Sequence, residues 1–253
     1  MHDPGDGRGG AVASRPTRRY RDVAELLAGV TGRTPLDGAP GKSGARLERV
    51  MIDGQGYVLK HLDLSFNEIL VPLDTSTTRE EIEKYSPSGR VPVLRHGEVS
   101  VWDSLAICEY LAEFSGKGWP KAAPARAVAR AVSAEMHSGF TNLRSLWPMN
   151  ARARNRHTAM TAALEADIER IDESWNDCRS RFGAAGPWLF GEYSIADAMY
   201  APVVLRFNTY GAGSISPAAR WYMASVLEDA PLQEWLQAAK QESWTHPASE
   251  VGH

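Results

Sequence analysis

Two dipeptide steps in this chain have residue types that could carry chemistry, Val91-Pro92 and Asp103-Ser104. Proline cannot donate a hydrogen bond to a sheet ladder, so a proline near the start of a strand is unusual, and one found there is often cis. Asp103-Ser104 opens a predicted helix, whose first turn is a ready site for an anion. The same pair is also an ordinary helix N-cap. The residue types alone therefore leave ligand binding and helix capping both open.

A strand pair and a helix must position these two steps. Valines and a leucine predict two short strands, over residues 91–94 and 99–101, and residues 96–98 supply a glycine-containing reversal between them. Apolar residues then recur at three- and four-residue spacing over residues 105–112, which predicts an amphipathic helix. The sequence thus predicts loop, strand, turn, strand and helix in immediate succession.

This succession resembles the glutathione-binding half of the thioredoxin-like domain in soluble glutathione transferases. In that family a Val-Pro dipeptide with a cis proline precedes a strand pair and an acidic-Ser step into a helix. A second motif, Gly-x-x-Ser-Ile-Ala-Asp at residues 191–197, is similar to the folding element of the family's C-terminal domain. The resemblance covers roughly residues 66–244. It implies an α/β thioredoxin-like N-terminal domain followed by an all-α C-terminal domain.

The resemblance also implies a glutathione site. Val91 would bind the cysteinyl part of glutathione through its backbone N–H and C=O, and a cis Pro92 would aim these groups away from the sheet ladder. Ser104 would bind the γ-glutamyl carboxylate through its hydroxyl and N–H, and Asp103 would pair with the γ-glutamyl ammonium. Arg90 could reach the glycyl carboxylate. Glutathione is then a co-substrate, and no metal is expected.

Three further residues have structural interpretations. Ser194 and Asp197 predict a capping box at the start of a helix in the C-terminal domain, so we expect both to be structural. His137 lies on a predicted long helix. It could line a substrate pocket in the second domain, or it could be an ordinary helix histidine, and the sequence leaves both open.

The N-terminal part of the chain departs from that family. Residues 1–19 are rich in Gly and Arg and predict a disordered tail. Residues 20–65 resemble the start of aminoglycoside-phosphotransferase-like kinases, in which a lysine at the position of Lys60 would hold nucleotide phosphates. The residues nearest to a catalytic-loop motif, His96-Gly97-Glu98, fall in a predicted hairpin turn, and no downstream metal-binding Asp motif follows. We therefore expect a kinase-like fragment without kinase chemistry.

The predicted domains are then a partial thioredoxin-like domain over residues 66–115 and an all-α domain over residues 122–244. The abrupt change of character at residues 65–66 also leaves open a fused reading frame.

The predicted strands upstream of this change leave a gap in the family pattern. Hydrophobic patterning predicts a hairpin of strands at residues 47–52 and 57–62, then a strand at 66–73. The last two are too close in sequence for the crossover that parallel strands require. We therefore expect the family's first strand and first helix to be missing, with a strand from residues 45–62 substituting in part or the N-terminal half loosely ordered.

The expected gap extends to catalysis. In the family, a Ser, Tyr or Cys between the first strand and first helix stabilises the glutathione thiolate and so supplies the nucleophile. Ser65 is the only hydroxyl near the right strand end, and we do not assign it as catalytic. The catalytic residue therefore stays unknown.

Composition limits the classes of partner. A net charge of −3 gives no indication of nucleic-acid or anionic-membrane binding, and no apolar run approaches the roughly 20 residues that span a bilayer. The two cysteines, Cys108 and Cys178, fit neither a zinc nor a CxxC pattern. This usage is typical of a reduced cytoplasmic protein.

Three functions remain open. The first is a glutathione transferase acting on glutathione and a small hydrophobic electrophile, as a possible homodimer. The second is a non-catalytic protein of the same fold that binds glutathione or a partner but has lost the thiol-activating residue. The third, which we rank last, is a phosphotransferase-related chain.

Overall fold

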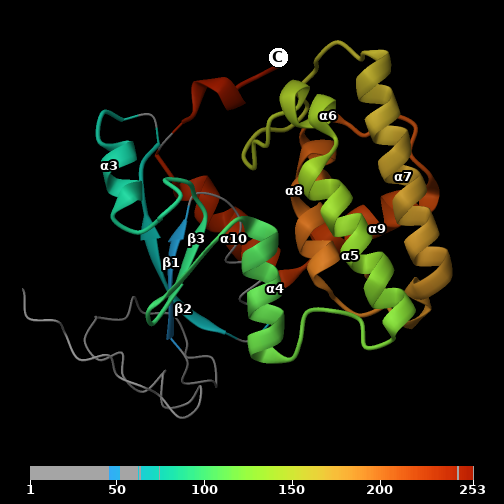
Figure 1. Ribbon diagram of the computed structural model, residues 1–253. Coiled ribbons are helices and arrows are strands. Elements are labelled where there is room, and N and C mark those ends of the chain that lie inside the picture. Colours follow the sequence, from blue (N-terminus) through green and yellow to red (C-terminus); the bar gives the residue numbers. More distant parts are fainter. Residues whose placement is uncertain (1–45, 52–61, 63, 74, 244, 253) are drawn as a thin grey trace, which may run out of the picture.

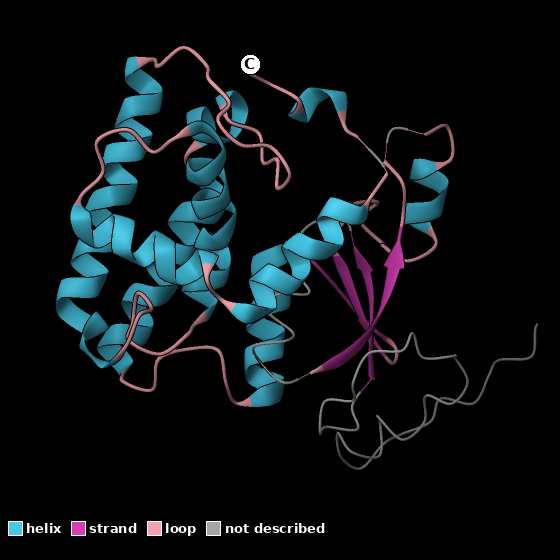
Figure 2. Cartoon of the chain, turned by 180° about the vertical axis from the view of Figure 1, so that it is seen from behind, coloured by secondary structure: helices cyan, strands magenta, loops and turns pink. Residues whose placement is uncertain are grey.

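The computed structural model describes residues 46–51, 62, 64–73, 75–243 and 245–252. A small sheet lies to one side of a larger helical body (Figures 1 and 2). The strands are β1 (Arg46–Met51), β2 (Ser65–Leu70), β3 (Val93–His96) and β4 (Val99–Trp102). The helices are α3 (Thr78–Glu83), α4 (Ser104–Ser115), α5 (Ala123–Ser138), α6 (Thr141–Leu146), α7 (Ala162–Phe182), α8 (Ile195–Tyr210), α9 (Pro217–Leu227) and α10 (Ala230–Gln241), with short turns η1 (Gly183–Ala185) and η2 (Pro247–Ser249).

The sheet has the strand order β2-β1-β3-β4. Strand β1 pairs in parallel with β2, from Arg46 opposite Ser65 to Met51 opposite Leu70. Its other edge pairs antiparallel with β3, where Val50 lies opposite Val93. Together with the helical body, this sheet confirms the predicted fold class of a thioredoxin-like domain followed by an all-α domain.

The position of β1 corrects one expectation. The family's first strand was expected to be missing, and residues 46–51 occupy its place between β2 and β3. The alternative prediction, that a strand from residues 45–62 substitutes there, is confirmed for these six residues. A strand at residues 57–62 would leave too few residues for the crossover that a parallel β1–β2 pair requires. The apolar run at these residues does not by itself establish a strand, because periodicity does not distinguish a short strand from other buried structure.

Two other predicted features fall in this connection. Apart from Leu62, the predicted strand at residues 57–62 lies outside the described residues, as does Lys60. The sheet includes strands from both sides of the predicted boundary at residue 65. The segment before Ser65 therefore contributes a strand to the thioredoxin-like sheet, while the predicted domain limits themselves stay predictions.

The helical body is built around α7 and α8. An apolar stripe along α7 is buried, at Leu164, Ile168, Ile171, Trp175 and Cys178. The Trp175 ring meets the rings of two fully buried tyrosines edge to face, from α8 and from α9, at centroid distances of 5.6 and 4.9 Å. Large aromatic side chains thus form the centre of the core of the helical body.

The predicted capping box at the start of α8 is present. The Asp197 carboxylate accepts hydrogen bonds from the Ser194 N–H (2.8 Å) and hydroxyl (3.0 Å), from the Leu189 N–H (3.0 Å) and from the Tyr222 hydroxyl (3.1 Å). Burial raises the pKa of Asp197 to about 6, and these four hydrogen bonds oppose that rise. Asp197 therefore joins α8, the loop before it and α9, which is a structural role.

Helix α4 connects the two halves, since it packs against β3 and β4 on one side and against α5 on the other. It begins at the end of β4 with the Asp103 N-cap. In the part of the chain that the structure describes, no helix combines the length and apolar character needed to cross a bilayer.

Candidate functional site

A cavity of about 640 Å³ lies where the sheet meets the helical body. We call it the interdomain cavity. On the sheet side it is lined by the loop before β3 and by the first turn of α4, and on the other side by residues of α5, α6, α8 and α10. Its volume is in the range of small-molecule sites. The four residues that the sequence predicts to contact glutathione all line it, and so does Pro92, which is predicted to orient Val91; the four are Arg90, Val91, Asp103 and Ser104.

The Val91-Pro92 peptide bond is cis, as the motif predicts. Val91 and Pro92 directly precede β3, whose first two residues, Val93 and Leu94, are fully buried. The buried strand therefore anchors the dipeptide at the cavity wall. Because Val91 precedes β3, its backbone N–H and C=O lie outside the strand, in a residue that lines the cavity.

Asp103 combines the two roles that the sequence left open. As the N-cap of α4, its Oδ1 accepts hydrogen bonds from the N–H groups of Leu105 (3.0 Å) and Ala106 (3.2 Å). Its φ of 76° lies in the region that favours glycine. Strained backbone of this kind concentrates at ligand sites, where the surroundings hold it in place. Its side chain is nevertheless 44% exposed, at the cavity.

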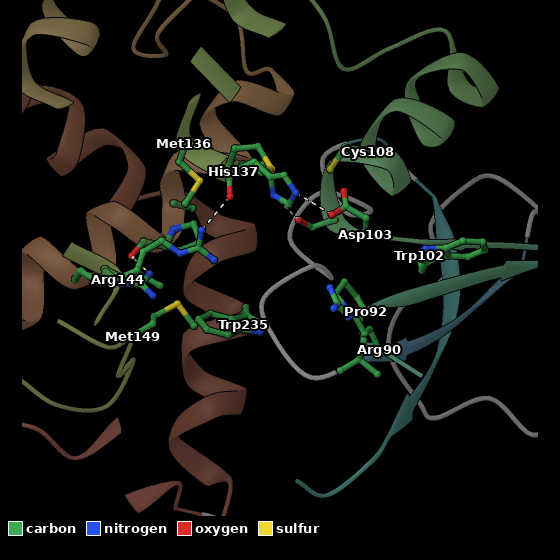
Figure 3. Close-up of a pocket in the computed structure, with 18 of the residues that line it drawn as sticks. Arg90, Pro92, Trp102, Asp103, Cys108, Met136, His137, Arg144, Met149 and Trp235 are labelled. Atoms are coloured by element: carbon green, nitrogen blue, oxygen red, sulfur yellow. Dashed lines mark hydrogen bonds and ion pairs between the residues drawn. The ribbon is translucent and has the colours of Figure 1, made fainter. Parts of the chain in front are cut away.

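His137, in the last turn of α5, reaches across the cavity to both residues of this step. Its Nε2 lies 2.8 Å from Asp103 Oδ2, and its Nδ1 lies 3.4 Å from Ser104 Oγ (Figure 3). A neutral imidazole satisfies both contacts if Nε2–H donates to the carboxylate and Nδ1 accepts from the hydroxyl. Of the two interpretations that the sequence left open for His137, the structure favours the cavity.

The opposite wall was not predicted from the sequence. It contains apolar side chains, including Met136, Met149 and Trp235, and two arginines, Arg144 of α6 and Arg206 of α8. Figure 3 shows Arg144, Met136 and Met149 on the side away from Pro92 and Arg90. These residues come from four helices and, for Met149, the loop after α6, and they share no sequence motif, so only tertiary packing brings them together.

The described residues that line this cavity include more positive than negative side chains. Among the described residues that line it, Asp103 is the only carboxylate, whereas Arg90, Arg144 and Arg206 are cations. A concave site lined by one sign of charge raises the local concentration of ligands of the opposite sign. The cavity is therefore suited to a ligand with anionic groups.

Of the residues considered for kinase chemistry, His96, Gly97 and Glu98 do not line this cavity, and Lys60 lies outside the described residues. His96 is buried, its Nδ1 lies 2.7 Å from the Tyr110 hydroxyl, and its ring packs edge-on against Phe114. Burial lowers the pKa of His96, so its neutral form is favoured. The structure places His96 at the buried end of β3 rather than in the turn where the sequence placed it, so it is a core residue.

Comparison with known families agrees with the two sequence signatures. Residues 56–113 match the glutathione S-transferase N-terminal domain family, and residues 161–238 match the glutathione S-transferase C-terminal domain family. The first match begins inside the segment that resembled a kinase.

Two curated relatives match shorter stretches. A protein named dichloromethane dehalogenase from Methylorubrum extorquens is 45% identical over 60 residues, which are 22% of this chain and 21% of the relative. A protein of the same name from Methylophilus leisingeri is 38% identical over 53 residues, 20% of each chain. The chain thus matches about a fifth of the length of each of these relatives.

Solved structures show the same fold over most of the chain. A Burkholderia glutathione transferase homologue with bound glutathione is 21% identical, covers 78% of this chain and 100% of its own, and superposes with a TM-score of 0.60. Human glutathione S-transferase T1-1 in its apo form is 20% identical and covers 81% and 93% of the two chains, with a TM-score of 0.56. At such identities the likeness establishes the fold.

Proposed function

Because the chain belongs to the soluble glutathione transferase family, we propose that it binds glutathione in the interdomain cavity and transfers the thiolate to a small electrophile. One observation carries the proposal. The cis Val91-Pro92 step precedes β3 and the Asp103-Ser104 step follows β4, and the antiparallel pairing of Val93 with Trp102 brings both steps to one end of the hairpin, where they line the same cavity. The Burkholderia homologue of the same fold holds glutathione, which supports this choice of ligand.

Each part of the tripeptide has a partner of suitable chemistry. The backbone of Val91 binds the cysteinyl unit. Ser104 binds the γ-glutamyl carboxylate at the start of α4, where the helix dipole favours an anion. Asp103 pairs with the γ-glutamyl ammonium, since a carboxylate oxygen that already accepts one hydrogen bond can accept another. Arg90 pairs with the glycyl carboxylate.

The position of β1 indicates where to seek the thiol-activating group. In this family that group follows the first strand, and residues 46–51 occupy the place of the first strand. In residues 52–64, between β1 and β2, Tyr57 is the only residue of the Ser, Tyr or Cys type. Tyr57 lies outside the described residues, and we propose it as the candidate donor to the thiolate. Ser65 instead begins β2.

A non-catalytic role is the second candidate, and the described cavity lining favours it in one respect. Its hydroxyl and thiol groups belong to Ser88, Ser104 and Cys108. Ser104 is already assigned to the γ-glutamyl carboxylate, and Cys108 is buried inside α4. If Tyr57 does not activate the thiol, the described lining offers no better group.

Titration calorimetry and a turnover assay separate the candidates. We expect glutathione to bind the intact chain and Ser104→Ala to weaken this binding, and we expect conjugation of a chlorinated nitroaromatic that Tyr57→Phe slows strongly. Glutathione binding without turnover would favour the non-catalytic role. No glutathione binding at all would refute both.

A second compound, besides the chlorinated nitroaromatic, tests the identity of the electrophile. The names of the two curated relatives support a trial of dichloromethane, with chloride release as the readout. The family resemblance also supports a cytoplasmic homodimer, and sedimentation of the purified chain tests its assembly.

A further inference from the structure

The helical wall of the interdomain cavity carries more positive charge than the tripeptide requires. The two glutathione carboxylates have partners at Ser104 and Arg90, both on the sheet side. Arg144 lies on the other side of the cavity, next to Met136 and Met149 (Figure 3). Its charge is therefore placed where the second substrate would lie.

The guanidinium of Arg144, an exposed residue of α6, is oriented by one hydrogen bond that leaves its charge unneutralised. Its Nη1 donates to the carbonyl oxygen of His137, at 2.9 Å. A guanidinium has five N–H donors in a fixed planar fork, and this bond uses one of them. Within the described part of the chain, no carboxylate forms an ion pair with Arg144. Such a fork matches the two oxygens of a carboxylate or a sulfonate.

Arg206 adds a second fixed cation to the same wall. Its Nε donates to the Trp147 carbonyl at 2.8 Å and its Nη1 to the Pro202 carbonyl at 3.1 Å. Arg206 is half-buried, so these backbone contacts fix the position of its charge. Cations held by backbone carbonyls, beside apolar side chains, are suited to a ligand that is partly anionic and partly apolar.

We infer that the electrophile carries an anionic group, a carboxylate or a sulfonate, on an apolar body. Arg144 binds the anionic group, and Met136, Met149 and Trp235 pack against the body. This inference rests on the proposed function, because it assigns the helical wall to the second substrate. A neutral haloalkane such as dichloromethane would make no use of Arg144.

The test compares two fluorescent probes that share one apolar framework. Anilinonaphthalene sulfonate carries an anionic group, and N-phenylnaphthylamine lacks it. Binding of each is titrated to the full chain, to Arg144→Gln, and to Arg144→Lys, which keeps the charge without the fork. Arg220→Gln is the matched control, because Arg220 is an exposed residue of α9 that does not line the cavity.

We expect Arg144→Gln to weaken binding of the sulfonate probe about tenfold, since a charge-assisted contact is lost. The neutral probe should change less than about twofold, Arg144→Lys should retain part of the affinity, and the control should match the wild type. S-hexylglutathione should displace the sulfonate probe, which would place it in the interdomain cavity. Equal losses for both probes, or no loss for either, would overturn the inference.

A glutathione titration of the same variants separates this inference from the proposed function. Unchanged glutathione affinity in Arg144→Gln is expected. If only glutathione affinity falls, Arg144 belongs to the tripeptide site and the inference is wrong while the proposed function stands. If glutathione binds neither the wild type nor the variants, the proposed function fails, whereas the two probes still report whether Arg144 selects an anion.

Discussion

Two helices of this protein begin with the same pair of residue types, and the two beginnings have different surroundings. Helix α4 begins with Asp103 and Ser104, and α8 begins with Ser194 and, within its first turn, Asp197. Both aspartates accept two backbone N–H hydrogen bonds. At α8 the aspartate is fully buried, and at α4 it faces a cavity.

The difference in burial follows from the groups, other than backbone N–H, that contact each carboxylate. Asp197 also accepts the Ser194 and Tyr222 hydroxyls, so protein groups surround it. Asp103 Oδ2, which is not used in the helix cap, contacts His137 on the opposite side of the cavity. The backbone of Asp103 has a positive φ, a conformation that glycine adopts more readily than other residues. A cap enclosed by protein stabilises the fold, whereas a cap at a cavity is available to a ligand. Residue type does not distinguish these cases, but burial does.

The largest expected effect is at the buried cap. Asp197→Asn places an amide NH₂ against groups that are all donors, and we expect the free energy of unfolding to fall by about 3–5 kcal/mol. Urea unfolding followed by tryptophan fluorescence measures this. The matched Asp103→Asn change should cost far less. Equal losses at the two positions would break the comparison.

The two serines should separate stability from binding. We expect Ser104→Ala to weaken glutathione binding about tenfold, because the carboxylate loses a hydrogen bond at a helix start. Ser194→Ala should instead lower the free energy of unfolding by about 1 kcal/mol and leave glutathione affinity unchanged, as loss of a cap does. Calorimetry and urea unfolding of both variants are needed. Weakened glutathione binding in Ser194→Ala alone would contradict the assignment.

His137 provides a smaller test of the contact between the domains. His137→Ala removes the hydrogen bonds to Asp103 and Ser104, and we expect the free energy of unfolding to fall by about 1 kcal/mol, since the imidazole is only partly buried. The glutathione titration should show a change of severalfold, because both partners lose an orienting contact. His157→Ala, which does not line the cavity, is the control. Identical behaviour of the two variants would remove His137 from the site.

The smallest effect is expected for Asp103→Asn. Asparagine keeps a cap acceptor and tolerates a positive φ, so the free energy of unfolding should change by less than about 0.5 kcal/mol. Glutathione affinity should still fall, because the charge that pairs with the ammonium is lost. Urea unfolding and calorimetry of the same preparation test both halves. A stability loss as large as that of Asp197→Asn would show that Asp103 is structural.

Much of the fold could be predicted because its signals are local. The alternation of valines gives β3 and β4, and the Asp103 step marks the start of α4 within one residue. The stripe along α7 and the capping box of α8 follow from spacing alone. The place of β1 was mispredicted because strand pairing is a long-range property. An apolar run at residues 57–62 carries no information about whether the strand before it pairs with β2.

The candidate site likewise has one part that local sequence signals predict and one part that depends on long-range packing. By itself, the sequence determined the sheet-side wall, because Val91-Pro92 and Asp103-Ser104 carry their chemistry in adjacent residues with a known backbone geometry. Only the tertiary structure decided that His137 meets Asp103 and Ser104 and that Arg144 and Met149 face them. His137 and Arg144 lie on separate helices and Met149 lies in the loop after α6, so the packing of α5 and α6 beside α4 sets the distances between their side chains.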